Sequence, residues 1–214
     1  MCMSTIAKDK QIAQDCWNKS LFCFGTSELL KIRATFLKNI INWQTYAGVA
    51  IPVFVGGLVL CFDFSDNSLS YIKCTFGIMN IPFILFSLWI IVWRCQDGYV
   101  NLSQTAYEHS VLSEKFQDLA RKVNCDSPPS INEIESEYNF LKREDEHLTR
   151  KINELNIKEC EKRYGMRFAL RQFQRKCTGC DEIPKDLLPT DCSVCGQFRF
   201  RFPLLVCIIY DTKR

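Results

Sequence analysis

Two long stretches without a charged residue limit what this chain can fold into. Residues 39–62 and residues 74–93 contain no Lys, Arg, Asp or Glu, and both are mostly apolar. A helix of about 20 apolar residues spans a hydrocarbon core of ~30 Å and satisfies its own backbone hydrogen bonds there. The sequence therefore predicts a transmembrane hairpin over 42–94, with spans at about 43–62 and 74–93. The alternative is a buried helical hairpin in a soluble domain.

The charges beside the spans predict how the hairpin is oriented. Basic residues near a membrane favour the cytoplasmic side. Both termini are therefore expected in the cytoplasm, as in a multi-pass membrane protein. Trp43, Trp89 and Trp93 are expected at the same interface, where an indole N–H stays hydrated. The flanking residues are Lys31, Arg33, Lys38 and Arg94 on the side of the termini, and Asp63, Asp66 and a single Lys73 in the connection.

Small and polar residues inside the spans are candidates for helix packing or for a pore. Gly48, Pro52 and Gly56 recur every four residues, a spacing that lets another helix backbone approach closely. Asn80 and Pro82 lie inside the second span, where an amide needs a hydrogen-bond partner. A packing hydrogen bond next to the proline and a pore-lining or oligomer contact are both open. No acid or base lies within either span, which argues against a proton- or ion-coupled transporter.

Helical patterns fill the segments before and after the hairpin. Residues 1–41 are expected to form N-terminal amphipathic helices, interrupted at 25–27, that lie on the membrane or pack on later helices. Residues 98–176 are expected to form a long cytoplasmic helical hairpin that turns at 126–129. Its second helix is expected to run unbroken to about residue 174. The apolar seam of this hairpin could instead join copies of the chain.

Two further polar patterns lie in this helical hairpin. His109 and His147 are isolated, so we expect them to make packing hydrogen bonds rather than to bind metal. Four arginines spaced four residues apart lie along one helix face. They form either a solvated or acid-paired face, or a site for an anion such as phosphate, acidic lipid, nucleic acid or an acidic protein. These residues are Arg163, Arg167, Arg171 and Arg175.

The most specific chemical motif consists of two Cys-x-x-Cys pairs near the end of the chain. Cys177 and Cys180 are separated by eleven residues from Cys192 and Cys195. Each pair can direct two thiolates at one centre, and two pairs complete a tetrahedral shell for Zn²⁺. With four thiolates and no open position, the zinc is expected to be structural. Disulfides, a thioredoxin-like redox motif and an iron–sulfur cluster are the less favoured alternatives, and the other nine cysteines show no ligand spacing.

Residues 177–214 are therefore expected to form a zinc-binding module with C-terminal strands. Residues 198–202 alternate Phe with Arg, which predicts a two-faced strand, and 204–210 form an apolar run too short to span a membrane. The Phe/Arg alternation could also contact nucleic acid, the less favoured interpretation. The predicted fold class is an all-α membrane protein: an amphipathic lead-in, a transmembrane hairpin, a cytoplasmic helical hairpin and a small Cys₄ module with short strands.

This arrangement resembles a known protein family. Two adjacent spans, a long helical hairpin and a Cys-x-x-Cys pair repeated after eleven residues are similar to the bacterial mobilome CxxCx(11)CxxC proteins, a branch of the SLATT two-transmembrane effectors. The resemblance implies a prokaryotic inner-membrane protein of mobile elements, used in conflict or anti-phage systems. It also implies an effector that oligomerises and permeabilises the membrane when a nucleotide signal or a protein sensor activates it.

The resemblance thus implies a non-enzymatic membrane effector whose partners are the lipid bilayer and further copies of itself. The alternative is a membrane-tethered adaptor whose zinc module binds nucleic acid or a protein. We expect no enzyme, because the sequence offers no pair of carboxylates in a pocket context, no Ser/Cys–His constellation and no phosphate-binding glycine loop.

Overall fold

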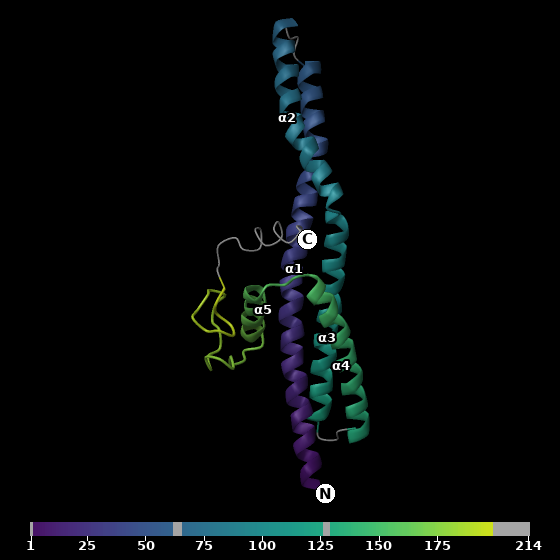
Figure 1. The fold of residues 1–214 in the computed structure, drawn as a ribbon, viewed down its shortest axis with the longest axis vertical. Helices are drawn as coiled ribbons and strands as arrows, with labels where there is room; N and C mark the ends of the chain where they lie inside the picture. The colour runs from purple at the N-terminus through teal and green to yellow at the C-terminus, as the bar shows by residue number, and fades with distance from the viewer. Residues whose placement is uncertain (1, 62–65, 126–128, 199–214) are drawn as a thin grey trace. The chain divides into compact units, whose positions relative to one another are not determined.

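The computed structural model describes residues 2–61, 66–125 and 129–198, which form five helices and no strand (Figure 1). This confirms the mostly helical prediction with a cysteine cluster near the C-terminus. The predicted strand lies outside the described residues except for Phe198, which is not in a strand, and the 204–210 run lies outside them entirely. The helices are α1 (Cys2–Cys61), α2 (Asp66–Val92), α3 (Cys95–Val123), α4 (Ile131–Glu154) and α5 (Glu159–Gln172).

The chain divides into two units, which are described separately. Unit 1 contains Met1–Arg33 and Leu102–Arg214, and unit 2 contains Ala34–Asn101. Helices α1 and α3 contribute residues to both units.

Unit 1 has a core in which three helices bury their apolar faces. The predicted pairing of α3 and α4 is present, and the start of α1 closes it into a three-helix core, so the N-terminal segment packs on later helices. Leu112, Phe116 and Leu119 of α3 have no exposed surface. Within the chain, this seam therefore pairs α3 with α4. The core residues are Ile12, Ala13, Cys16 and Cys23 of α1, Leu112, Phe116, Leu119, Ala120 and Val123 of α3, and Ile134, Leu141 and Leu148 of α4.

The predicted interruption at 25–27 is wrong, because α1 is continuous through it. Gly25 lies where α1 meets α5: a Cβ added there would be 2.6 Å from the carbonyl oxygen of Gly165. The glycine therefore permits close approach of two helix backbones. Ser27 is fully buried inside α1 rather than capping a new helix.

The predicted unbroken second helix is also wrong, because α4 ends at Glu154 and α5 begins at Glu159. Asn156 takes a left-handed conformation with φ 47°, which stops α4. Glu161 starts α5 by accepting a hydrogen bond from the backbone N–H of Lys158 at 2.9 Å. The break lets α5 leave the line of α4 and pack on α1 (Figure 1).

A buried ion pair fixes this break to α1. Arg33 and Glu161 are 5% and 4% exposed, and their side chains make two hydrogen bonds of 3.1 and 2.5 Å. The third guanidinium nitrogen of Arg33, Nη1, donates to the carbonyl oxygen of Leu155 at 3.1 Å. Since removal of one partner would leave an uncompensated buried charge, this contact specifies where the turn sits against α1.

The core of unit 1 also contains polar side chains. Lys19 pairs with Asp145, which accepts a hydrogen bond from the Cys23 thiol at 3.7 Å. His109 is fully buried, and neither ring nitrogen has a hydrogen-bond partner among the described residues. The packing hydrogen bond predicted for His109 is therefore absent, although the side chain does pack in the core.

In unit 2, α2 returns alongside the Ala34–Cys61 part of α1. Gln44 donates a hydrogen bond to Ser87 at 3.1 Å, and a Cβ at Gly48 would lie 3.7 Å from the ring of Phe83. No single helix in the described residues is long and apolar enough to cross a membrane; one pair, Asn80–Val92 with Cys95–Val123, meets the length and composition criteria across a 47° bend. Residue 62 and several side chains of the predicted spans, including those of 58–61, lie outside the described residues.

A methyl group at Gly165 is predicted to separate α5 from α1. Its Cβ would lie 2.6 Å from the carbonyl oxygen of Gly25, and a helix backbone cannot move aside as a side chain can. We expect Gly165→Ala to destabilise unit 1 by about 1–3 kcal/mol, measured by urea unfolding. Gly98→Ala is the control, because its Cβ would make an ordinary 3.6 Å contact with Leu37. Equal effects of the two substitutions would contradict the close crossing.

The buried His109 predicts a pH dependence of unit 1. Burial, reinforced by Lys151 and opposed by Asp145 and Glu108, lowers the pKa of His109 from 6.5 to about 4. Because the folded pKa lies below the unfolded one, protons bind the unfolded chain more tightly, and stability falls as the pH drops from 6.5 towards 4. We expect a loss of about 2 kcal/mol by about pH 5, measured by hydrogen exchange of the α3 amides.

His109→Leu is the matched variant for this measurement. It places an apolar side chain in the core and removes the titrating group. The hydrogen-exchange protection of the α3 amides should therefore rise and lose most of its pH dependence between about pH 7 and about pH 5. An unchanged pH dependence would show that another group is responsible.

Candidate metal centre

Four cysteine thiols lie together after α5. The Sγ atoms of Cys177, Cys180, Cys192 and Cys195 are all within 4.8 Å of one another. Cys177 lies 3.8 Å from Cys192, and Cys180 lies 3.9 Å from Cys195. A tetrahedral centre with metal–sulfur bonds of about 2.3 Å requires sulfur–sulfur distances of about 3.8 Å. The four predicted ligand residues are thus spaced to hold a metal ion such as zinc.

The two Cys-x-x-Cys pairs have the same backbone geometry. In each pair the N–H two residues after the first cysteine points at that cysteine's sulfur: Gly179 to Cys177 and Val194 to Cys192, both at 3.4 Å. In each pair the N–H four residues after the first cysteine also bonds to that cysteine's carbonyl oxygen, at 2.8 and 2.9 Å. Such N–H donors stabilise thiolate charge, so the repeated turn orients the sulfurs and favours the ionised form that a metal requires.

The thiols differ in their electrostatic surroundings. Hydrogen bonds from the backbone N–H groups of Cys195 and Val194 lower the pKa of Cys192 to about 7. Burial raises the pKa of Cys195. A divalent cation among the four sulfurs would supply the charge that keeps the buried thiol ionised.

Two glycines permit close contacts in the module, Gly179 between the two cysteine pairs and Gly196 between the second pair and Thr190. A Cβ at Gly179 would lie 2.8 Å from a methyl carbon of Val194 and 3.1 Å from the sulfur of Cys192. A Cβ at Gly196 would lie 2.5 Å from the carbonyl oxygen of Thr190. Gly196 is therefore required for space, since no described glycine has a positive φ.

Three of the four predicted arginines lie on α5, whereas Arg175 lies beyond its end at Gln172, and Arg167 contacts the metal module. Arg167 is 6% exposed and donates to the carbonyl oxygen and the carboxylate of Asp186, both at 2.9 Å. Its guanidinium also lies 3.4 Å from the Thr190 hydroxyl and 3.9 Å from the sulfur of Cys195. The ion pair with Arg167 lowers the pKa of Asp186. Arg167 thus connects α5 to the segment between the cysteine pairs.

The other three arginines have separate surroundings. Arg163 donates to the side chain of Gln197 at 3.0 Å, and Arg175 lies 5.1 Å from the ring centroid of Trp17. Arg171 is exposed. The four residues therefore do not form one open anion-binding face.

The candidate residues of the predicted spans are not gathered into a site. Gly48 faces Phe83, whereas a Cβ at Gly56 would meet nothing within 4 Å. Pro52 and Pro82 are accommodated within α1 and α2, and Asn80 is half-buried.

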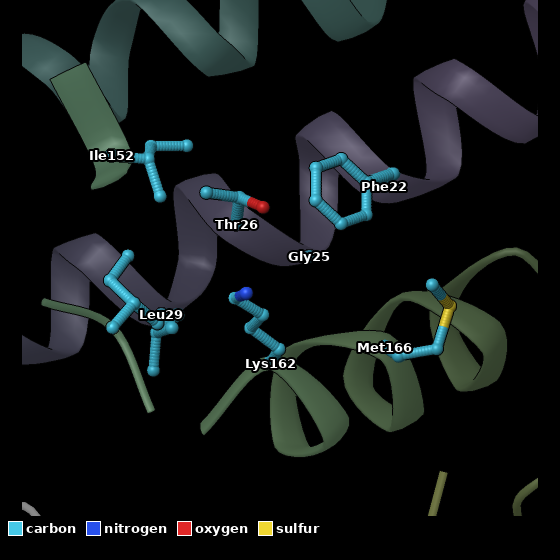
Figure 2. Close-up of a pocket in the computed structure, with 8 residues that line it drawn as sticks. Phe22, Gly25, Thr26, Leu29, Ile152, Lys162 and Met166 are labelled. Carbon is cyan, nitrogen blue, oxygen red and sulfur yellow. The ribbon is translucent and has the colours of Figure 1, made fainter. Parts of the chain in front are cut away.

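Two hollows among the described residues of unit 1 bear on the site. An open hollow of about 740 Å³ adjoins the metal centre and is lined in part by Cys180, Cys192 and Cys195. Figure 2 shows a second, mainly apolar pocket where α1 crosses α5, with Phe22, Leu29 and Met166 around it and Lys162 at its side. This pocket has no convergent set of polar groups that would suggest catalysis.

The sequence analysis did not identify Asp186, Thr190 or the Arg33–Glu161 pair. Asp186 and Thr190 lie among ordinary polar residues between the cysteine pairs, and no spacing in the sequence links them to Arg167. The sequence indicates only that Arg33 flanks a predicted membrane span. It does not show the pairing of Arg33 with Glu161, because the two residues are 128 positions apart.

The chain is similar to the members of one protein family. No curated protein and no solved structure matches it. The model of one family, described as Mobilome CxxCx(11)CxxC protein, matches residues 13–198 and so includes most of α1, the other four helices and both cysteine pairs. The chain therefore belongs to the mobilome CxxCx(11)CxxC protein family.

Proposed function

We propose that this protein is a non-enzymatic membrane effector of a prokaryotic mobile element, of the SLATT type, with a structural zinc in its cytoplasmic part. The observation that carries the proposal is the surface of unit 2. Among the described residues, fifteen of the twenty-one exposed large hydrophobic side chains lie between Trp43 and Trp93. No charged residue lies in 39–62 or 74–93 to keep this surface in water.

The exposure argues against the alternative of a buried hairpin in a soluble domain. Val53, Ile81 and Ile91 are 69%, 57% and 68% exposed, and neither core cluster includes a residue of unit 2. A water-soluble chain would bury such side chains or use them to bind a partner. A lipid bilayer is the partner that accepts apolar side chains all round a helix pair.

Aromatic side chains support the proposed orientation. Trp89 stacks on Phe86 with ring centroids 5.9 Å apart and lies 5.4 Å from the ring of Trp93. Trp43 makes an edge contact with Tyr46 at 6.4 Å. The hydrogen bond between Gln44 and Ser87 puts both groups at one end of the helix pair, as an interfacial aromatic belt requires. Both termini would lie on the cytoplasmic side of this belt.

Zinc is the metal that the centre fits best. Four thiolates favour zinc or an iron–sulfur cluster. The sulfur–sulfur distances of 3.8 and 3.9 Å suit a single ion, because an iron–sulfur cluster holds its cysteine sulfurs farther apart. The zinc would stabilise a module with little apolar core of its own.

We expect the reduced, freshly purified chain to contain about one zinc, because four thiolates at this spacing form a closed structural site. Cys177→Ser should lose the zinc and the hydrogen-exchange protection of the module, while α3 and α4 keep theirs, since their core lies elsewhere. Cys125→Ser is the control, because Cys125 is exposed and outside the cluster. Full-length protein without zinc by elemental analysis would contradict the assignment.

We expect induced expression to depolarise cells, measured with a membrane-potential dye. The expected assembly uses close helix packing, so Gly56→Leu should reduce depolarisation and crosslinking between copies. Gly56 is suited to this test because, among the described residues, a Cβ there would meet nothing within 4 Å. Val53→Leu on the same exposed helix is the control.

Two outcomes would count against this function. Depolarisation by Gly56→Leu equal to that of the parent chain would exclude this helix face as the assembly contact. Membrane-inserted protein that never depolarises cells would favour the adaptor, in which the hairpin is only an anchor.

A further inference from the structure

The four cysteines of the metal centre differ sharply in their access to solvent. Cys177 and Cys195 are each 1% exposed, Cys192 is half-buried and Cys180 is exposed. If all four cysteines were buried, their sulfurs would be protected from reagents. Here one sulfur is presented at the surface, next to a hollow of about 740 Å³ that Cys180, Cys192 and Cys195 help to line. The hollow gives a small molecule a path to the thiolates.

The neighbour of the exposed sulfur is placed to form a disulfide with it. Cys180 and Cys195 lie 3.9 Å apart at sulfur and belong to different Cys-x-x-Cys pairs. Gly179, next to Cys180, approaches Val194, next to Cys195, so the two turns are already in contact. Zinc-bound sulfur keeps thiolate character, and thiolates are the form of cysteine that reacts with peroxides.

We propose that Cys180 is an oxidation site for hydrogen peroxide, and that its oxidation to a disulfide with Cys195 releases the metal. The inference rests on the zinc site proposed above. The Cys180 thiolate attacks one peroxide oxygen, the O–O bond breaks, and a sulfenic acid forms as hydroxide leaves. The Cys195 thiolate then attacks that sulfur, forming the S–S bond and expelling a second hydroxide. Two thiolates lose two electrons, the peroxide gains them, and two protons from solvent complete two waters.

The consequence is loss of the metal module. Two of the four ligands become unavailable, so zinc leaves the remaining pair. Cys195 also contacts Arg167 at 3.9 Å and belongs to the core that Leu21, Ala169 and Leu170 form with the cysteines. Oxidation therefore acts on the packing of the module against α1 and α5.

The test follows zinc and cysteine oxidation together in the full-length reduced protein. Peroxide is added, zinc release is read with a chromogenic chelator, and the disulfide is mapped by differential alkylation and mass spectrometry. We expect one Cys180–Cys195 disulfide per zinc released, reversed by dithiothreitol with added zinc. Zinc released while Cys180 remains free to alkylate, or a disulfide confined to Cys177 and Cys192, would overturn the proposal.

Two matched variants separate the role of Cys180 from loss of a ligand. Cys180→His and Cys192→His each leave three thiolates and one imidazole, a set that binds zinc. Cys180→His should release zinc at least tenfold more slowly than the parent, whereas Cys192→His, which keeps Cys180 and Cys195, should release it at a rate near that of the parent. Equal rates for the two variants would overturn the assignment to Cys180.

The zinc content before oxidation distinguishes this inference from the proposed function. Reduced protein without zinc would overturn the zinc site and this inference together. Zinc that stays bound in peroxide would overturn this inference alone and leave the structural site in place.

Discussion

Unit 1 depends on α1, which packs against other parts of the unit with two different faces. One face of α1 buries Ile12, Cys16 and Cys23 against α3 and α4, and another buries Leu21 against α5 and the cysteine module. Because a helix turns about 100° per residue, residues five apart such as Cys16 and Leu21 point to different sides. The helical core and the metal module are thus built on a shared support.

The metal module depends on α5 for contacts that its own residues do not provide. A segment this short has too little apolar surface to fold on burial alone. It packs on Ala169 and Leu170, and the buried Arg167 bonds to the segment between the cysteine pairs. In turn α5 is held by the Gly25–Gly165 crossing and by the Arg33–Glu161 pair. The thiol geometry is therefore connected to α1 by a continuous series of packed contacts.

The sequence predicted local chemistry well and long-range pairing poorly. The four cysteines were identified because their spacing alone limits the geometry, and α3 and α4 were predicted because their seam is periodic. The interruption expected at 25–27 failed because Gly25 permits a helix crossing, which its local neighbours do not reveal. The break after Glu154 was missed because it depends on a distant residue: Arg33 donates to the carbonyl oxygen of Leu155, next to the left-handed Asn156. The role of the four arginines was ambiguous because the sequence does not show that Asp186 contacts Arg167 and that Gln197 contacts Arg163.

The contacts of Arg167 explain why the interval between the cysteine pairs has a defined length. Asp186 and Thr190 must both reach one guanidinium on a rigid helix, while the cysteines on either side must reach one centre. An inserted or deleted residue before Asp186 would displace the first pair relative to the helix, and one after Thr190 would displace the second. The length of eleven residues between the cysteine pairs is thus set by α5 as much as by the metal. A chain with a different number of residues between its pairs would need the arginine equivalent to Arg167 on another turn of the helix.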